Sequence, residues 1–408
     1  MGTGPDGRTP TASSGAAADA ALALAVALGD RFAAGAAARD RERRFPAEEV
    51  AALKASGLGA LRVPAEHGGL GGDTRSLHRV TAAIAAGDPN VAQMLHIHLL
   101  GVEMIRDHVN IVPEARREYF RRIVEERQLL TNAYSELGTK TVDTFTVRLS
   151  RDAAAGGWRL AGRKFYCTGS LAGEFAYVVG VTDEPEPRTL LGFVDTDWPG
   201  VVIHEDWTGM GQRTTASGTM EFIDVLVPDD RLCEVGFLSP ESLQGGLSQL
   251  LFASIMIGIA RAALADAVDF VRTRSRPWVH SGVARAADDP YVLLRIGEMR
   301  ALLDAAEATA EAAVDARRAA EAAPSIAARD RASVAISSAK YTATEAALRI
   351  GERLFQVCGA SSSLEQHDYD RHWRNARTIS LHDPADYKLR LIGDYLVNGA
   401  SPPVSGYT

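Results

Sequence analysis

A chain of 408 residues is too long for one ordinary hydrophobic core, so two or three domains are expected. Its 46% hydrophobic and 24% charged residues are typical of a soluble globular protein, and its net charge of −8 argues against a nucleic-acid-binding protein, which would present a basic surface. The three cysteines, Cys167, Cys233 and Cys358, are too widely spaced for a zinc site or a disulfide framework, so no metal site is expected and a reduced, cytoplasmic setting fits.

The N-terminal segment, residues 1–14, is rich in Gly, Thr, Ser and Pro, and we expect it to be disordered. The apolar stretch Ala16–Leu28 resembles the core of a signal peptide. However, Asp19 interrupts it and it continues into charged helical sequence, which favours an amphipathic helix. No run reaches the roughly 18 uninterrupted apolar residues of a membrane span, so no membrane association is expected.

The rest of the chain falls into three regions. Residues 15–128 have a helical pattern, residues 129–237 alternate like strands separated by Gly, Pro and Asp clusters, and residues 238–408 are helical again. The predicted strands are Phe145–Leu149, Trp158–Leu160, Tyr177–Val181, Leu190–Val194 and Gly218–Phe222. The predicted long bundle helices are Ser248–Thr273, Tyr291–Ala323 and Ser325–Gln356. The pattern predicts an α+β protein with a small β domain between two helical domains.

Three arginines, two histidines, a tryptophan and an asparagine are concentrated in the run Arg371–Pro384. Because a residue that precedes proline is pushed away from helical geometry, Asp383-Pro384 predicts a turn. His382 is then expected at the end of a loop, where its side chain can be aimed at a ligand. The alternative is a solvated basic surface loop.

This run reads RHWRNART followed by LHDP. It resembles the C-terminal motif of the monooxygenase branch of the acyl-CoA dehydrogenase superfamily, the group of dibenzothiophene monooxygenases and related two-component flavin hydroxylases. Residues 58–69 resemble the superfamily's bend of a glycine, a Val-Pro step and a closing Gly-Gly pair. The matching motifs occur in order over nearly the whole chain beyond Gly15. The resemblance implies an acyl-CoA dehydrogenase fold, with an N-terminal helical domain, a middle β-barrel-like domain and a C-terminal four-helix bundle.

The resemblance also implies which residues bind flavin. Asn132–Gly138 is similar to a segment that lines the flavin, and Gly162–Ser170 to a segment beside the ring. Gln356–Ala360 and an arginine after the first bundle helix are similar to groups that reach the cofactor of an adjoining subunit. The implied cofactor-binding residues are Asn132, Tyr134, Ser135, Tyr166, Thr168, Ser170, Arg274, Arg276, Gln356, Gly359 and His382. The alternatives are a plain strand turn at Gly169 and charge compensation of a helix C-terminus by the arginines.

A dehydrogenase needs a carboxylate to remove a substrate proton, and both positions where the family carries one lack it. His382 stands at one position and Ser248 at the other, with Asp383 as the only acid nearby. An acyl-CoA dehydrogenase is therefore the alternative rather than the main interpretation. A catalytically idle family member that binds acyl groups or partners is the third.

The resemblance implies that a C4a-hydroperoxyflavin is held by neutral donors and acceptors. The predicted catalytic residues are His98, His382, Ser170 and Asn132. His98 is chosen over His96 because it aligns on the Leu-Leu-Gly that follows, although residues two apart on a helix point in different directions. A helix histidine hydrogen-bonded to a neighbouring carbonyl is the alternative for His98.

No nucleotide-binding G-x-G-x-x-G segment follows a strand, so a separate NAD(P)H:flavin reductase is expected to supply FMNH2 or FADH2, and O2 is the co-substrate. The resemblance implies a homotetramer. Tyr134, Trp207 and Met256 suggest an apolar or aromatic small molecule, hydroxylated or oxygenated at sulfur or nitrogen.

Overall fold

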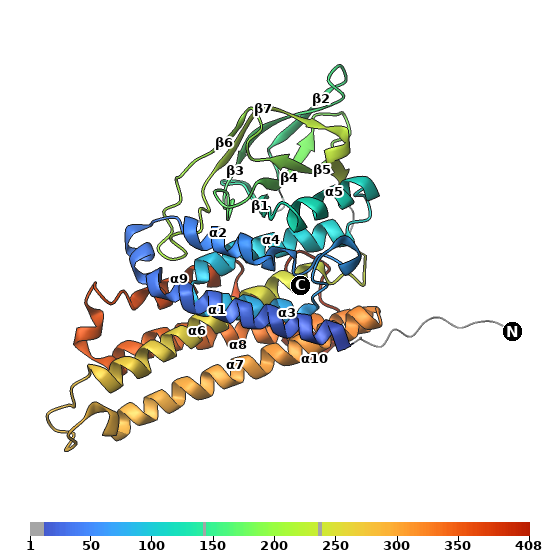
Figure 1. The fold of residues 1–408 in the computed structure, drawn as a ribbon. Helices are drawn as coiled ribbons and strands as arrows, with labels where there is room; N and C mark the ends of the chain where they lie inside the picture. Colours follow the sequence, from blue (N-terminus) through green and yellow to red (C-terminus); the bar gives the residue numbers. More distant parts are fainter. Residues whose placement is uncertain (1–11, 142–143, 236–238) are drawn as a thin grey trace.

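The computed structural model describes residues 12–141, 144–235 and 239–408 (Figure 1). Residues 1–11 of the segment predicted to be disordered lie outside this part of the chain. Residues 12–14 of that segment are helical, because helix α1 begins at Ala12. Within the described residues, these α-helices precede the strands: α1 Ala12–Glu42, α2 Ala47–Ser56, α3 Thr74–Gly87, α4 Pro89–Asp107 and α5 Pro113–Val124.

The junction of α3 and α4 is set by Asp88. Its side chain accepts a hydrogen bond from the backbone N–H of Asn90, and Pro89 occupies the first turn of α4, where a missing N–H costs nothing. Arg39 of α1 donates to the same carboxylate and pairs with Glu49 (2.6 Å). This buried network fixes the direction in which α4 leaves α3.

The middle region forms one mixed sheet, with its strands in the order β6-β7-β3-β2-β4-β5-β8 and β1 parallel to β4. The strands are β1 Leu130–Ala133, β2 Arg148–Asp152, β3 Gly157–Lys164, β4 Phe175–Thr182, β5 Thr189–Asp195, β6 Val201–Ile203, β7 Met220–Pro228 and β8 Leu232–Glu234. The predicted strands are present, although β2 begins three residues later than predicted. The short strands β1, β6 and β8 were not predicted, because three or four residues carry little periodicity.

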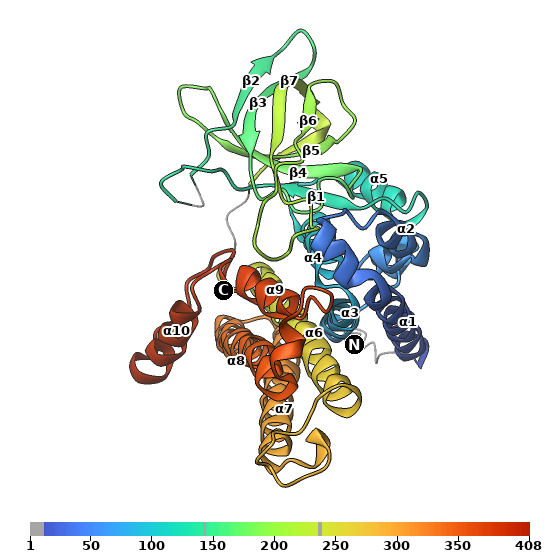
Figure 2. The ribbon, with the colours of Figure 1, turned by 90° about the vertical axis from the view of Figure 1, so that its left-hand side faces the viewer.

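The C-terminal helices are α6 Gln244–Thr273, α7 Pro290–Ala322, α8 Ile326–Cys358, α9 Asp370–Ser380 and α10 Ala385–Asn398. The β domain stands at one end of the molecule and the long helices at the other, with α4 between them (Figure 1). Figure 2 shows α10 at the side of the bundle. The α+β class and the helical bundle predicted from the sequence are confirmed.

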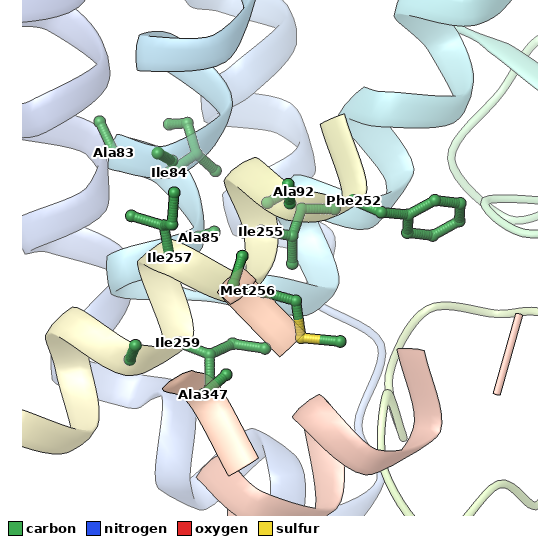
Figure 3. Packing of buried hydrophobic residues seen from close by; sticks show 14 of the residues in the cluster. Ala83, Ile84, Ala85, Ala92, Phe252, Ile255, Met256, Ile257, Ile259 and Ala347 are labelled. Carbon is green, nitrogen blue, oxygen red and sulfur yellow. The ribbon is translucent and has the colours of Figure 1, made fainter. Parts of the chain in front are cut away.

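Helix α6 is the centre of the core. Ile255, Ile257 and Ile259 are fully buried, and α6 packs against Ala85 of α3 and Ala92 of α4 (Figure 3). Helix α6 and residues 16–42 of α1 are each long and apolar enough to cross a membrane by length and composition alone. In α6, 72% of that apolar window is buried inside the protein, as expected for a core helix, against 33% in α1.

Helices α3 and α6 are in close contact at Gly258. A methyl group there would overlap the Ala85 side chain and lie 2.7 Å from the Ala82 carbonyl oxygen. Alanine is favoured over glycine by about 1 kcal/mol in a helix, but overpacking against backbone costs about 1–3 kcal/mol. We therefore expect Gly258→Ala to lower the thermal unfolding midpoint.

The matched control is Gly297→Ala in α7, where an added methyl group meets no atom of the described residues within 4 Å. This change should raise the midpoint, because only the helix propensity acts. Equal shifts of the same sign in the two variants would contradict close α3–α6 packing.

Candidate functional site

A cavity of about 1430 Å³ lies where α4, β1, the segment after β6, the first turns of α6 and the end of α9 meet. Ligand cavities of proteins commonly measure about 300–1000 Å³. The cavity is therefore large enough for a cofactor and a small substrate together.

One wall of the cavity is polar and carries groups that lack partners. The Asn132 side-chain oxygen and both polar atoms of the Gln212 amide have no hydrogen-bond partner within the described residues. Beside them the hydroxyl groups of Thr168, Ser217 and Thr215 form a chain, with oxygen–oxygen distances of 2.8 and 2.6 Å. Buried amides without partners are costly, so this wall is built for a polar ligand.

The turn that carries Thr168 has two residues in the left-handed region. Tyr166 has φ +57° and Gly169 has φ +80°. The Gly169 N–H donates to Thr215 O at 2.9 Å, which joins this turn to the hydroxyl chain. A left-handed conformation is unfavourable for tyrosine, and such strain is concentrated at functional sites.

The motif Arg371–Pro384 holds the polar wall in place from outside. Helix α9 contains most of the motif, and its Asn375 side-chain oxygen accepts from the Gln212 N–H at 2.6 Å. Thr378 accepts from the Gly211 N–H at 3.0 Å. Gly211 touches the Arg374 carbonyl so closely that any side chain would overlap it. Much of the motif therefore positions a loop of the β domain and does not face the ligand.

An aromatic group forms the next part of the wall. The Phe165 and Tyr166 rings are 4.8 Å apart, and the Trp207 ring lies 6.1 Å from Tyr166. The Trp207 indole N–H donates to Gln212 O at 2.7 Å. This surface suits a flat apolar molecule.

The histidine on α4 that reaches the cavity is His96 and not His98, which corrects the sequence prediction. His98 is fully buried, its Nε2 donates to Gly59 O at 2.8 Å and its Nδ1 accepts from the Leu130 N–H at 2.9 Å. Burial lowers the pKa of His98 to about 4. His98 thus matches the alternative from the sequence, a helix histidine hydrogen-bonded to a carbonyl. Its second hydrogen bond, to Leu130, joins β1 to α4.

His96 lines the cavity together with Ser248 and Phe252 of α6. Its Nε2 lies 3.3 Å from the Ser248 hydroxyl oxygen and its Nδ1 lies 3.4 Å from Gln93 Oε1. Burial, with smaller effects from His382 and Lys340, holds the pKa of His96 well below its usual value. His96 is therefore a neutral imidazole at neutral pH.

Phe252 separates His96 from His382. Its ring centroid lies 4.5 Å from that of His96 and 4.3 Å from that of His382. Figure 3 shows the Phe252 ring pointing away from the core residues around α6. His382 lines the cavity as predicted, just beyond the end of α9. Met256, which the sequence suggested for the pocket, is fully buried in the core instead.

No carboxylate is available at either position where a dehydrogenase would carry one. Ser248 occupies the first and His382 the second, and the acid next to His382, Asp383, is paired with Lys388 (2.8 Å). Burial alone would raise the pKa of Asp383, but His382, Lys340 and Lys388 outweigh it and hold that pKa well below its usual range. Asp383 is therefore an anion engaged by cations, which makes it a poor base.

Other predicted site residues do not line the cavity. The Ser170 hydroxyl donates to Ala216 O at 2.9 Å and is buried, so it stabilises the turn. Arg274 and Arg276 lie beyond the far end of α6, about 33 Å of helix from Phe252, and Gln356 and Gly359 lie at the C-terminal end of α8. Arg274 lies against His367 (3.3 Å), and Gln356 accepts from Arg353 (2.7 Å).

Of the predicted cofactor residues, those that line the cavity are Asn132, Tyr134, Ser135, Tyr166, Thr168 and His382. Sequence reasoning placed Gln212 only within a segment that could wall the cavity, and it missed Ser217 and Phe252 as site residues. The i, i+4 spacing of Ser248 and Phe252 on one helix face was the available signal for Phe252.

The unpaired amides and the hydroxyl chain match the donor and acceptor edge of an isoalloxazine, and the aromatic wall matches its face. With a β domain set between two helical domains, this cavity is that of a flavin-dependent oxidoreductase.

Comparison with known proteins defines the family. Residues 23–127 match the acyl-CoA dehydrogenase N-terminal domain and residues 250–387 match the acyl-CoA dehydrogenase C-terminal domain. The chain is 33% identical to a dibenzothiophene monooxygenase of Rhodococcus erythropolis, over 95% of each chain. It is 32% identical to a probable FMNH2-dependent monooxygenase, SfnC, of Pseudomonas putida, over 95% of this chain and 97% of the relative.

Among solved structures, the complex of TdsC from Paenibacillus sp. A11-2 with FMN and indole superposes with a TM-score of 0.88 at 32% identity, over 95% of this chain and all of the other. The chain belongs to the acyl-CoA dehydrogenase family and, within it, to the flavin-dependent monooxygenases. The resemblance stated from the sequence is thereby confirmed.

The unpaired Gln212 amide predicts that one substitution will raise the stability of the flavin-free protein and lower its affinity for flavin. Replacing a buried amide that has no partner with an apolar group of similar size is neutral or stabilising, by roughly 1 kcal/mol. Gln212→Leu should therefore raise the thermal midpoint of the flavin-free protein. The same change should weaken binding of reduced flavin about tenfold, measured by anaerobic fluorescence titration.

Thr214→Val is the matched control. The Thr214 hydroxyl is also buried without a partner among the described residues, but it does not line the cavity. This variant should gain stability with unchanged flavin affinity. If both variants bind flavin like the wild type, Gln212 does not contact the cofactor.

Proposed function

We propose that this chain is the oxygenase component of a two-component system. It binds reduced flavin delivered by a separate NAD(P)H:flavin reductase and uses O2 to oxygenate a small apolar or aromatic molecule. FMNH2 is favoured over FADH2 because SfnC is described as a probable FMNH2-dependent monooxygenase and the TdsC complex contains FMN. The TdsC complex contains indole, which supports a flat aromatic substrate, and the Tyr166–Trp207 wall supports the same class.

The observation that carries the proposal is the pair of imidazoles on the cavity wall, at a place where a dehydrogenase needs a free carboxylate. His96 and His382 flank Phe252, and Asp383 is engaged by Lys388. Reduced flavin, when bound, supplies the electrons that activate O2 for transfer of one oxygen atom. The C4a-hydroperoxyflavin that the resemblance implies is part of this proposal.

The residues of the chain have separate tasks. Asn132, Gln212 and Thr168 orient the polar edge of the ring, and Ser170 keeps the turn beneath it. His96 and His382 provide neutral hydrogen-bonding groups beside the reacting centre, and the aromatic residues exclude water. In this arrangement His96 takes the role that the sequence assigned to His98.

The predicted homotetramer is retained as part of the proposal. Leu389, Leu396 and Val397 of α10 are 41%, 72% and 82% exposed, and the seven-residue spacing of the two leucines places them on one side of the helix, where no partner is present within the described chain. In such an assembly Arg274, Arg276, Gln356 and Gly359 would contact a neighbouring subunit's cofactor. Cytoplasmic location also remains a proposal.

The imidazole pair predicts the coupling of flavin oxidation to product. Hydrogen-bonding and acid–base groups of this kind typically contribute 10²–10⁴-fold. We expect His96→Ala and His382→Ala each to lower oxygenated product per reduced flavin at least about tenfold, with a matching rise in hydrogen peroxide. The assay supplies reductase, NADH and an aromatic acceptor such as indole.

His98→Ala is the control for His96→Ala, because it removes an imidazole from the same helix without touching the cavity. Its expected effect is a lower thermal midpoint through loss of the Gly59 and Leu130 hydrogen bonds. Wild-type coupling in both cavity variants would refute the proposed roles.

A second test separates oxygenase from dehydrogenase. With flavin bound and oxygen removed, addition of acyl-CoA substrates of several chain lengths should not bleach the oxidised flavin spectrum, because Ser248 and His382 stand at the two positions that carry the base in dehydrogenases and Asp383 is paired with Lys388. Rapid bleaching with any of them would favour the dehydrogenase alternative.

A further inference from the structure

His382 is the cavity imidazole whose surroundings are most strongly charged. Its Nδ1 lies 3.3 Å from the Asp383 carboxylate. An ionised carboxylate can only accept a hydrogen bond, so Nδ1 must carry the proton. In a neutral ring the other nitrogen, Nε2, then has a lone pair and no proton.

Asp383 is in turn surrounded by cations and donors from three helices. Lys388 of α10 lies 2.8 Å from one carboxylate oxygen and Lys340 of α8 lies 3.6 Å from the other. The Gln249 amide of α6, oriented with its nitrogen toward Asp383, donates to both oxygens at 3.2 and 3.3 Å. Two ammonium groups face one carboxylate, which leaves a local charge of about +1 and opposes a further proton on His382.

The other groups that face His382 add no formal charge. They are the neutral His96 of α4, the Phe252 ring of α6 and the Tyr407 ring of the C-terminal segment, 5.7 Å away. The surrounding protein lowers the pKa of His382, and Lys340 and Lys388 act in the same direction against the raising effect of Asp383.

Lys340 is a buried cation whose ion-pair partner, Asp383, lies 3.6 Å away. Its side chain is 3% exposed, and its ammonium group makes no hydrogen bond within the described residues. Its Nζ lies 4.0 Å from the centroid of the Phe252 ring, which contacts both imidazoles. Lys388, by contrast, also donates to Tyr407 O at 2.6 Å and so holds the C-terminal segment. Burial lowers the pKa of Lys340 to about 8, so it is still largely a cation at neutral pH. A buried ammonium without hydrogen bonds is costly, which points to a functional reason for keeping it.

We propose that Lys340 and Asp383 are positioning residues that hold His382 neutral, with its proton on Nδ1, so that Nε2 faces the cavity as a hydrogen-bond acceptor. Asp383 selects the tautomer and Lys340 supplies the positive charge that keeps a second proton off the ring. His382 therefore accepts a hydrogen bond from an N–H or O–H group of the cofactor or substrate. The catalytic meaning of the inference rests on the proposed function, but the charge state of His382 does not.

The charge state can be measured on the flavin-free protein. Diethyl pyrocarbonate modifies only unprotonated imidazole, so the rate at His382 between about pH 5 and 8, followed by peptide mass spectrometry, gives its titration midpoint. In the wild type this midpoint should lie below the ordinary histidine value. Lys340→Met removes one positive charge and should raise the proton affinity of His382 about tenfold, a shift of one unit in its pKa.

Lys340→Arg keeps the charge and should give the wild-type midpoint of His382. If the role of Lys340 were purely structural, the midpoint would not depend on the charge at position 340. Lys340→Gln serves as a second neutral variant if the methionine variant does not fold. Asp383→Asn should move the midpoint in the opposite direction, because it removes the one anion. His204, on the β domain, is the internal reference and should react equally in all variants.

An unchanged His382 midpoint in both neutral Lys340 variants would overturn the inference, whatever their activity. A raised midpoint supports it. The coupling assay then addresses the proposed function separately. If His382 matters for oxygenation, the acid limb of the coupling profile should move to higher pH in Lys340→Met and return in Lys340→Arg. A shifted midpoint with an unshifted profile would support the charge assignment and count against the catalytic role of His382.

Discussion

The guanidinium of Arg374 joins the three regions of the chain, and the cavity depends on this junction. It pairs with Asp40 of α1 (2.7 Å) and Asp368 before α9 (2.9 Å), and donates to Met210 O of the β domain (3.2 Å). Burial and the neighbouring Asp40 raise the pKa of Asp368 to about 7. The single guanidinium of Arg374 therefore pairs with two carboxyl groups that repel each other when both are ionised. Because Gly211 rests on the Arg374 backbone, this junction also fixes the loop that carries Gln212 into the cavity.

Charge in the cavity wall is arranged so that the imidazoles are neutral and the nearest carboxylates are engaged. His96 is kept neutral by burial, whereas the pKa of the partly exposed His382 is lowered by desolvation against the surrounding protein and by two lysines. Asp383 is engaged by Lys388, and Glu136 by Lys164 at 2.6 Å. A wall of this kind has little capacity to remove a proton from carbon, but it can hold hydrogen bonds to a reactive group in a space lined by aromatic rings. In the proposed function, this protonation chemistry suits an oxygenase rather than a dehydrogenase on the same fold.

Prediction from the sequence was most successful where the signal was local and long. The helices α6, α7 and α8 were placed to within a few residues because their apolar stripes extend over many turns. His382 was located from the Pro384 turn and a motif of unusual composition. Prediction failed at His98, where two histidines two residues apart could be distinguished only by their neighbours. Those neighbours, Gly59 and Leu130, lie 39 and 32 residues away in the sequence.

The sequence by itself determined the α+β class, the family and the absence of a glutamate at positions 248 and 382, because residue identity and periodicity are written in the chain. Only the tertiary structure decided that His96 faces the cavity, that Gln212 is left without a partner and that Lys340 stands beside Asp383. The physical reason is that the protonation and hydrogen bonding of a buried group are set by atoms that surround it in space. For this cavity those atoms come from α4, α6, α8, α10 and a loop of the β domain, which no short stretch of sequence contains.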